Sequence, residues 1–189
     1  MEDITIEKLM VPIVEYPSVD EDSTLYEAVS KLEEHRKNFI DQKKDPQRAI
    51  LVIDKDENLV GLVGQTDILQ ALEPKYNKLL EEEHYKFPMA SAFSKSFFKG
   101  ALSSYSLFSK PMKDICKDAA QQKIKECMQV VRESHLININ ESFEQALNQM
   151  IVSRLNRLIV LNDGEIVGVL RRTDVYSLVA EEILQCKIS

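Results

Sequence analysis

The sequence predicts a mixed α/β (α+β) fold built from two βαββα repeats with a helical insert between them. Three observations support this: the chain aligns with itself in two blocks, each copy has a helix-capping pair, and each copy has two short apolar runs joined by turn residues. Of the 189 residues, 44% are hydrophobic and 29% charged, as in globular proteins. About sixty residues bury little apolar surface alone, so we expect the repeats to pack through their sheets as a pseudo-twofold pair.

The internal repeat has two blocks with different offsets. Residues 6–10 and 24–28 align with segments 118 positions later, whereas residues 51–53 and 61–67 align with segments 107 positions later. The first copy therefore has eleven extra residues, which fall in the polar, lysine-rich stretch 34–47 and predict a surface loop or helix extension. These blocks assign the first repeat to residues 4–72, the insert to 73–121 and the second repeat to 122–184.

Each repeat is expected to begin with a short strand and a capped helix. Thr24 with Glu27, and Ser142 with Gln145, have the spacing of capping boxes, in which two orphan amides are satisfied reciprocally. Apolar residues at helical spacing follow each cap and predict one buried face per helix. The strands are expected near Ser18-Val19 and Leu136-Ile137, and the helix stripes are Leu25, Ala28, Val29 and Leu32, and Phe143, Ala146, Leu147 and Met150.

A hairpin and a second helix are expected to complete each repeat. In the first copy, the apolar runs 50–53 and 59–63 flank a polar turn. In the second copy, the runs 158–161 and 166–170 flank the turn 162–165. Apolar residues then recur at helical spacing in the second copy, at Val175, Leu178, Val179 and Ile183.

Composition and scattered reactive residues argue against several functions. The net charge of −7 disfavours nucleic-acid binding, which needs a basic face. No nucleophile–base pair, metal cluster or phosphate-binding Gly-rich loop stands out, so we expect no enzyme and no required cofactor. The N-terminus is acidic and no long apolar run follows, so we expect a cytoplasmic protein without a signal peptide or membrane span. Isolated thiols and imidazoles agree with a reducing compartment: Cys116, Cys127, Cys186, His35, His84 and His135.

Two aligned segments resemble the signature of the CBS (cystathionine-β-synthase-type) domain family. They read GLVGQTDIL from Gly61 and GVLRRTDVY from Gly168, and both keep the glycine and the aspartate of the family pattern. The serine or threonine of that pattern is replaced by Gly64 and Arg171. The resemblance implies a tandem pair, or Bateman module: a homodimeric regulatory sensor that binds AMP, ADP, ATP or S-adenosylmethionine in the cleft between its repeats.

The resemblance also implies which residues bind the ligand. An aspartate that opens a helix can accept hydrogen bonds from ribose hydroxyls, while the helix N-terminus offers amides to a phosphate. Arg171 with Arg172 could clamp a phosphate, and Tyr16 and His135 could stack on adenine, so we favour the second copy as the occupied site. Helix capping, surface and core roles stay open as alternatives. The candidates are Asp174, Thr173, Arg171, Arg172, His135 and Ser134, and, in the first repeat, Asp67, Thr66, Gly64, Tyr16 and Pro17.

The insert contains an aromatic and basic segment at residues 85–108. It holds seven of the thirteen aromatic residues, and residues 84–113 include five lysines and no acidic residue. We consider, in order of preference, that this segment packs on the module or across a homodimer, docks an unidentified protein partner, or lies on an anionic membrane. The alternative function is a ligand-free structural or dimerisation module acting through this insert. Its predicted helical stripe is Phe93, Phe97, Phe98, Ala101, Leu102, Tyr105 and Phe108.

Overall fold

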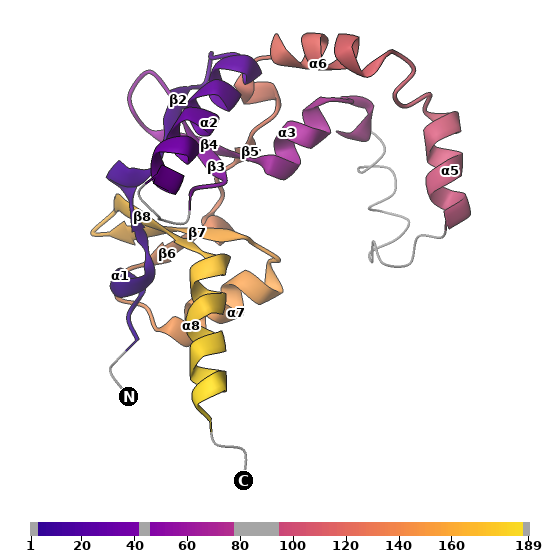
Figure 1. The fold of residues 1–189 in the computed structure, drawn as a ribbon. Helices are drawn as coiled ribbons and strands as arrows, with labels where there is room; N and C mark the ends of the chain where they lie inside the picture. The colour runs from indigo at the N-terminus through magenta and orange to yellow at the C-terminus, as the bar shows by residue number, and fades with distance from the viewer. Residues whose placement is uncertain (1–3, 42–45, 78–94, 187–189) are drawn as a thin grey trace. The chain divides into compact units, whose positions relative to one another are not determined.

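The computed structural model describes residues 4–41, 46–77 and 95–186 (Figure 1). The chain forms two compact units: one combines Met1–Tyr16 with Val131–Ser189, and the other is Pro17–Val130. Each unit contains one four-stranded sheet with flanking helices. The mixed α/β fold predicted from the repeats is therefore confirmed.

The sheet of the unit 17–130 has the strand order β2-β3-β4-β5. Strands β2 and β3 are parallel and joined by helix α2, whereas β3, β4 and β5 pair in antiparallel fashion. The β3–β4 pair is the predicted hairpin. The elements are β2 (Ser18–Asp20), α2 (Leu25–Asp41), β3 (Ala49–Ile53), β4 (Leu59–Gly64), α3 (Gln65–Ala71), the 3₁₀ helix η3 (Ile124–Glu126) and β5 (Gln129–Val130).

The sheet of the other unit has the order β1-β8-β7-β6. It repeats the first arrangement, because β6 is parallel to β7 and the remaining pairs are antiparallel. The elements are α1 (Ile6–Leu9), β1 (Val11–Pro12), the 3₁₀ helices η1 (Ile13–Glu15) and η4 (Glu133–His135), β6 (Leu136–Asn138), α7 (Phe143–Val152), β7 (Arg157–Asn162), β8 (Glu165–Arg171) and α8 (Arg172–Gln185).

The predicted helix starts and buried stripes are confirmed. The Glu27 amide donates to Thr24 Oγ1 at 3.2 Å and the Thr24 amide donates to Glu27 Oε2 at 2.7 Å. Ser142 and Gln145 make the same reciprocal pair at 3.2 and 2.8 Å. Seven of the eleven extra residues of the first repeat lengthen its helix, since α2 has 17 residues and α7 has 10. Each stripe joins its own core: Leu25 and Ala28 in one, Ala146 and Met150 in the other.

Two short edge strands were not predicted, because two residues carry no readable periodicity. Strand β1 pairs with β8, so the indigo start of the chain lies beside the yellow strand from its end (Figure 1). Strand β5 pairs with β4 in the same way. The compact units therefore cut across the sequence repeats, because residues up to Tyr16 group with the second repeat and residues up to Val130 with the first.

The signature glycines lie where these edge strands approach most closely. A Cβ atom added to Gly168 would stand 2.7 Å from Met10 Sδ and 2.7 Å from the Val11 carbonyl oxygen. A Cβ atom on Gly61 would stand 2.8 Å from Met128 Cγ. Met10 and Met128 are equivalent residues of the two repeats. In each sheet, the close approach of this methionine therefore requires a glycine on the neighbouring strand.

The described part of the insert includes the helices α5 (Lys95–Ser104) and α6 (Met112–Ala120). The predicted single stripe to Phe108 is wrong, because Ser106 and Phe108 have φ of 49° and 53° and break the helical path. Phe108 instead packs its ring edge on Tyr76, with centroids 5.9 Å apart. Its amide donates to Glu73 Oε2 at 2.8 Å, so this part of the insert packs on its own unit. Phe93 lies outside the described residues, and no described helix is long and apolar enough to cross a membrane.

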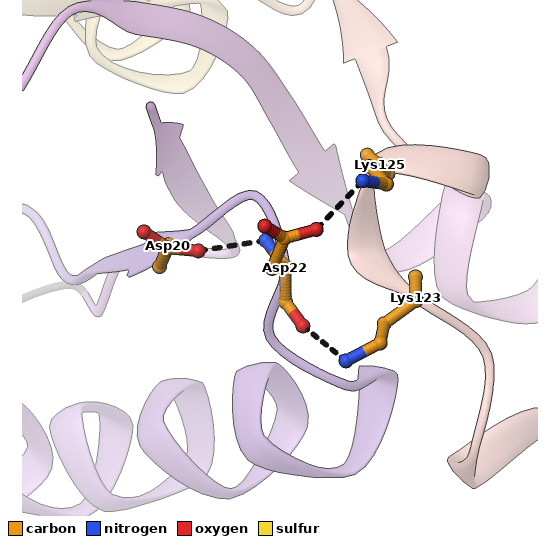
Figure 2. Close-up of polar contacts among 4 residues, drawn as sticks. All are labelled: Asp20, Asp22, Lys123 and Lys125. Atoms are coloured by element: carbon orange, nitrogen blue, oxygen red, sulfur yellow. Dashed lines mark hydrogen bonds and ion pairs between the residues drawn. The ribbon is translucent and has the colours of Figure 1, made fainter. Parts of the chain in front are cut away.

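A lysine clamp, defined as Lys123 and Lys125 on Asp22, fixes the segment leading into β5. Lys125 Nζ lies 2.6 Å from Asp22 Oδ1, and Lys123 Nζ donates to the Asp22 carbonyl oxygen at 2.6 Å (Figure 2). Asp20 Oδ1 accepts the Asp22 amide at 2.8 Å and shapes the turn. The hydrogen bond and charge of Lys125 lower the pKa of the Asp22 carboxyl below its ordinary value.

We expect Gly168→Ala to lower the free energy of unfolding by about 1–3 kcal/mol, because the backbone of Val11 cannot easily move away from the new methyl group. Gly61→Ala should cost less, since its neighbour is the flexible Met128 side chain. Gly100→Ala is the control: nothing lies within 4 Å, and it should stabilise α5 by about 0.5–1 kcal/mol. Urea unfolding measures all three, and equal effects at 168 and 100 would contradict the steric explanation.

Asp22→Asn should reveal an acid-sensitive contribution to stability. Because the folded-state pKa is depressed, the contribution is present above the unfolded-state pKa, near about 4, and is lost as pH falls through the lower folded-state value. At pH 7 the variant should therefore melt below the native protein, and the difference should vanish in stronger acid. Asp163→Asn, in an exposed turn, should show no such pH-dependent difference. A gap that persists at pH 2.5 would contradict this assignment.

Candidate functional site

In the first repeat, Asp67 lies in the first turn of α3 and is held from two sides. Its Oδ2 accepts the Gly64 amide at 2.7 Å, and its Oδ1 accepts from Gln129 Nε2 at 2.7 Å. The residue is only 8% exposed. Asp67 therefore acts as a helix cap that also ties the edge strand β5 to α3.

The candidates Gly64, Thr66 and Pro17 lie at the same end of this sheet, whereas Tyr16 belongs to the other compact unit. Ala49 is the register partner of Gly64, and the Pro17 carbonyl accepts the Leu51 amide at 2.9 Å. At this end of the sheet lie the start of β2, the start of β3 and the end of β4. Thr66 is exposed, whereas Tyr16 is only 7% exposed, so its ring is largely buried.

In the second repeat, Asp174 is held by a side chain instead of a backbone amide. Arg171 Nε lies 2.5 Å from Asp174 Oδ2, and Arg171 Nη2 lies 2.6 Å from Oδ1. The two side chains are 14% and 22% exposed, so this bidentate pair is mostly shielded from water. Arg172 and Thr173, in the first turn of α8, are exposed.

The sequence reasoning missed Arg157, the first residue of β7. In the antiparallel β7–β8 pair it stands directly opposite Arg171. Like charges directly opposite on neighbouring strands repel, so this end of the sheet favours negative charge. The strand register was the signal that could have found Arg157, because it follows once β7 and β8 are aligned as a hairpin.

Ser134 and His135 belong to η4, directly before β6. Gln149 Nε2 donates to the Ser134 carbonyl at 2.9 Å, and the Arg132 amide donates to His135 Nδ1 at 3.0 Å. Because β6 is parallel to β7, this segment lies beside the start of β7. The second-repeat candidates therefore share one end of their sheet with Arg157.

A pocket of about 680 Å³ lies next to Asp67 within the unit 17–130. Burial, followed by the negative charges of Glu126 and Asp67, raises the pKa of the Cys127 thiol there, which indicates a negative potential. Within the described ranges, no group of three His, Cys, Asp or Glu side chains is arranged to hold a metal ion. The polar lining includes Asp67, Gln70, Asn77, Gln122, Glu126 and Cys127, several of them from the insert and its neighbours.

The two aligned sites differ sharply in charge. Gly64 and Gln65 of the first repeat correspond to Arg171 and Arg172 of the second. The first site thus combines an engaged aspartate with an acidic pocket, while the second combines an aspartate with several arginines. An anionic ligand would favour the second site on electrostatic grounds.

Solved structures with the same fold have sequences that differ widely from this chain. A CBS domain-containing protein from Bacillus anthracis has a TM-score of 0.59 and 16% identity, covering 95% of this chain and 94% of its own. CBSX2 in complex with AMP has a TM-score of 0.51 and 18% identity, covering 95% and 98%. CBS domains of a transcriptional regulator from Streptococcus pneumoniae have a TM-score of 0.51 and 16% identity, covering 92% and 98%.

The family itself is identified from the sequence match. A comparison with curated protein sequences finds no match. The family model described as "CBS domain" matches residues 6–74 and 124–181, which together make up more than half of the chain and contain both signature segments. The chain therefore belongs to the CBS domain family and carries two copies of the domain in tandem.

Proposed function

We propose that the chain is a regulatory, ligand-sensing module that binds one phosphorylated adenosine compound, of the AMP, ADP or ATP type, at the Arg171–Asp174 segment of its second repeat. The observation that carries the proposal is the charge at this end of the sheet. Arg171 pairs with Asp174 in the first turn of α8, Arg157 stands opposite Arg171 in the β7–β8 register, and Arg172 is the first residue of α8. Arginines and a helix N-terminus together are a favourable environment for a phosphate group.

The bidentate pair suggests how a nucleotide is held. Asp174 can accept from ribose hydroxyls when Arg171 turns toward a phosphate, because a guanidinium makes the same bidentate contact with a phosphate as it makes here with the carboxylate. A ligand that opens this ion pair, or shares it, couples its own binding to the position of α8. A ligand changes the module only through such a difference in affinity between two arrangements.

The first repeat is a poorer site for the same ligand. Both Asp67 oxygens already accept hydrogen bonds, and uncharged residues replace the two arginines. A phosphate near the acidic pocket would meet Glu126 without a compensating cation in the pocket lining. We therefore infer one nucleotide per chain, with S-adenosylmethionine as the less favoured ligand of the second site.

CBSX2 has a similar fold, and its structure contains AMP. It supports an adenosine ligand for this chain only as an example of a protein with this fold that binds one. Within this proposal the module works without a required cofactor, as a cytoplasmic homodimer that changes its contact with a protein partner. It acts as a sensor and not as an enzyme.

The alternative is a ligand-free structural or dimerisation module acting through the insert. One observation favours it: each signature aspartate already has partners within the chain, Gln129 and the Gly64 amide for one and Arg171 for the other. In this view the aspartates are caps, and the helices α5 and α6 form the working surface.

Thermal unfolding with AMP, ADP, ATP and S-adenosylmethionine separates the two functions. At a hundred times its Kd, a ligand should stabilise the native protein by about 2.7 kcal/mol and raise Tm by several degrees. Asp174→Ala should abolish the rise, whereas Asp67→Ala and the exposed control Glu182→Ala should retain it. Absence of a shift with all four compounds would favour the ligand-free module. A shift lost in Asp67→Ala instead would move the site to the first repeat.

A double-mutant cycle should show that Arg171 and Asp174 are energetically coupled without ligand. We expect Asp174→Ala to cost roughly 1.5–3 kcal/mol, because it leaves a largely shielded guanidinium without its carboxylate. Adding Arg171→Ala should recover part of this loss, giving a coupling energy of about 0.5–3 kcal/mol. Additive costs in urea unfolding would contradict the pair as a stable contact.

A further inference from the structure

A second pocket, of about 640 Å³, lies far along the chain from the signature segments, where α1 meets the start of α7. All of its lining belongs to the unit that combines residues 1–16 with 131–189. Three carboxylates line it, and no lysine, arginine or histidine is among its lining residues. Its polar lining includes Thr5, Glu7, Asn140, Glu141, Glu144 and Asn162.

The other repeat has the same corner with the same backbone. The Asn140 amide donates to Asn138 Oδ1 at 2.9 Å, as the Asp22 amide donates to Asp20 Oδ1 at 2.8 Å. An isolated β-bridge closes each corner. It joins Thr5 to Ser142 in the second repeat and the aligned residues Lys123 and Thr24 in the first. The repeats therefore provide an internal comparison in which only the side chains differ.

In the first repeat, the lysine clamp fills this corner with cations. Lys125 contacts the Asp22 carboxylate and Lys123 contacts its carbonyl oxygen, both at 2.6 Å (Figure 2). Lys55 is a third cation, whose charge also lowers the pKa of Asp22. Two ammonium groups thus contact this turn, and a third acts on it through its charge.

None of these three cations is retained in the second repeat. The aligned residues are Thr5 for Lys123, Glu7 for Lys125 and Asn162 for Lys55, and all three line the pocket. The position where the first repeat places ammonium groups is thus open and bordered by carboxylates.

Two of the carboxylates are available to a ligand. Glu141 Oε1 already accepts the Asn138 amide at 3.1 Å. Glu7 and Glu144 have no side-chain hydrogen bond or ion pair with any residue in the described ranges. The lining therefore offers acceptors to a group that carries several donors.

We propose that this pocket binds a primary ammonium group supplied from outside the chain, at the place where the first repeat uses its own lysines. An ammonium has three donors, which suit Glu7, Glu144 and the Asn140 carbonyl, the equivalent of the Asp22 carbonyl. The described chain has no arrangement for a metal ion, so an organic cation is the fitting class. The group can come from a free amine or from a lysine side chain. This inference is independent of the nucleotide proposal.

NMR titration of the full chain tests the pocket directly. Cadaverine should shift the amide resonances of residues 139–144, and n-pentanol, which lacks the charge, should not. The apparent affinity should fall severalfold between 50 and 500 mM NaCl, because the contact is between exposed charges. Nα-acetyl-lysine methylamide tests the protein source: tighter binding than cadaverine assigns the pocket to a lysine side chain, and weaker binding assigns it to a free amine. No shift with either compound at 20 mM would overturn the proposal.

Glu7→Lys is the decisive variant, because it restores the residue type that the first repeat has at Lys125. It should occupy the pocket internally, lower amine affinity at least tenfold and leave the remaining spectrum unchanged. Glu144→Gln, at an exposed helix position, should weaken binding at least threefold and serves if the first variant disturbs the fold. Glu165→Gln, in the exposed β7–β8 turn outside the pocket, is the matched control and should bind as the native protein does. Native-like affinity in Glu7→Lys would overturn the proposal.

Discussion

Both sheets depend on the close approach of a two-residue edge strand to a signature glycine. At Gly168 the Val11 carbonyl lies where a side chain would begin, and at Gly61 the Met128 side chain does. Two side-chain contacts accompany this approach at β5: Gln129 donates to Asp67, and the lysine clamp holds η3, which directly precedes the strand. Glycine, whose side chain is a single hydrogen atom, therefore allows the edge strand to pair in both sheets, and in the first repeat this pairing also brings Gln129 to the candidate site.

The periodic parts of the fold could be predicted from the sequence, and the aperiodic parts could not. Capping pairs and apolar stripes located α2 and α7, because helix geometry repeats every few residues and leaves a pattern. Strands β1 and β5 are too short to leave one, so the grouping of residues up to Tyr16 with the second repeat was missed. The prediction for the insert failed for another reason: α5 ends at Ser104, and the left-handed residues Ser106 and Phe108 then break the helical path without a glycine to announce them.

The candidate site shows the same division between local and long-range information. The positions of Asp67 and Asp174 in the first turns of their helices followed from the motif alone. The identity of their partners did not, because Gln129 comes from a distant strand and Arg157 faces Arg171 only through the β7–β8 register. The ion pair between Arg171 and Asp174 could have been predicted from their spacing of three residues.

The pairing of β1 with β8 also sets an order of events during protein synthesis. Val11 leaves the ribosome early, but its partner Val169 is made near the other end of the chain. At roughly 5–20 residues per second, β1 waits about 8–30 s for its partner, while the unit 17–130 can complete its own sheet once β5 has emerged. The nascent chain thus carries β1 unpaired while the unit 17–130 completes its sheet, and the other unit can close only after β8 has been made.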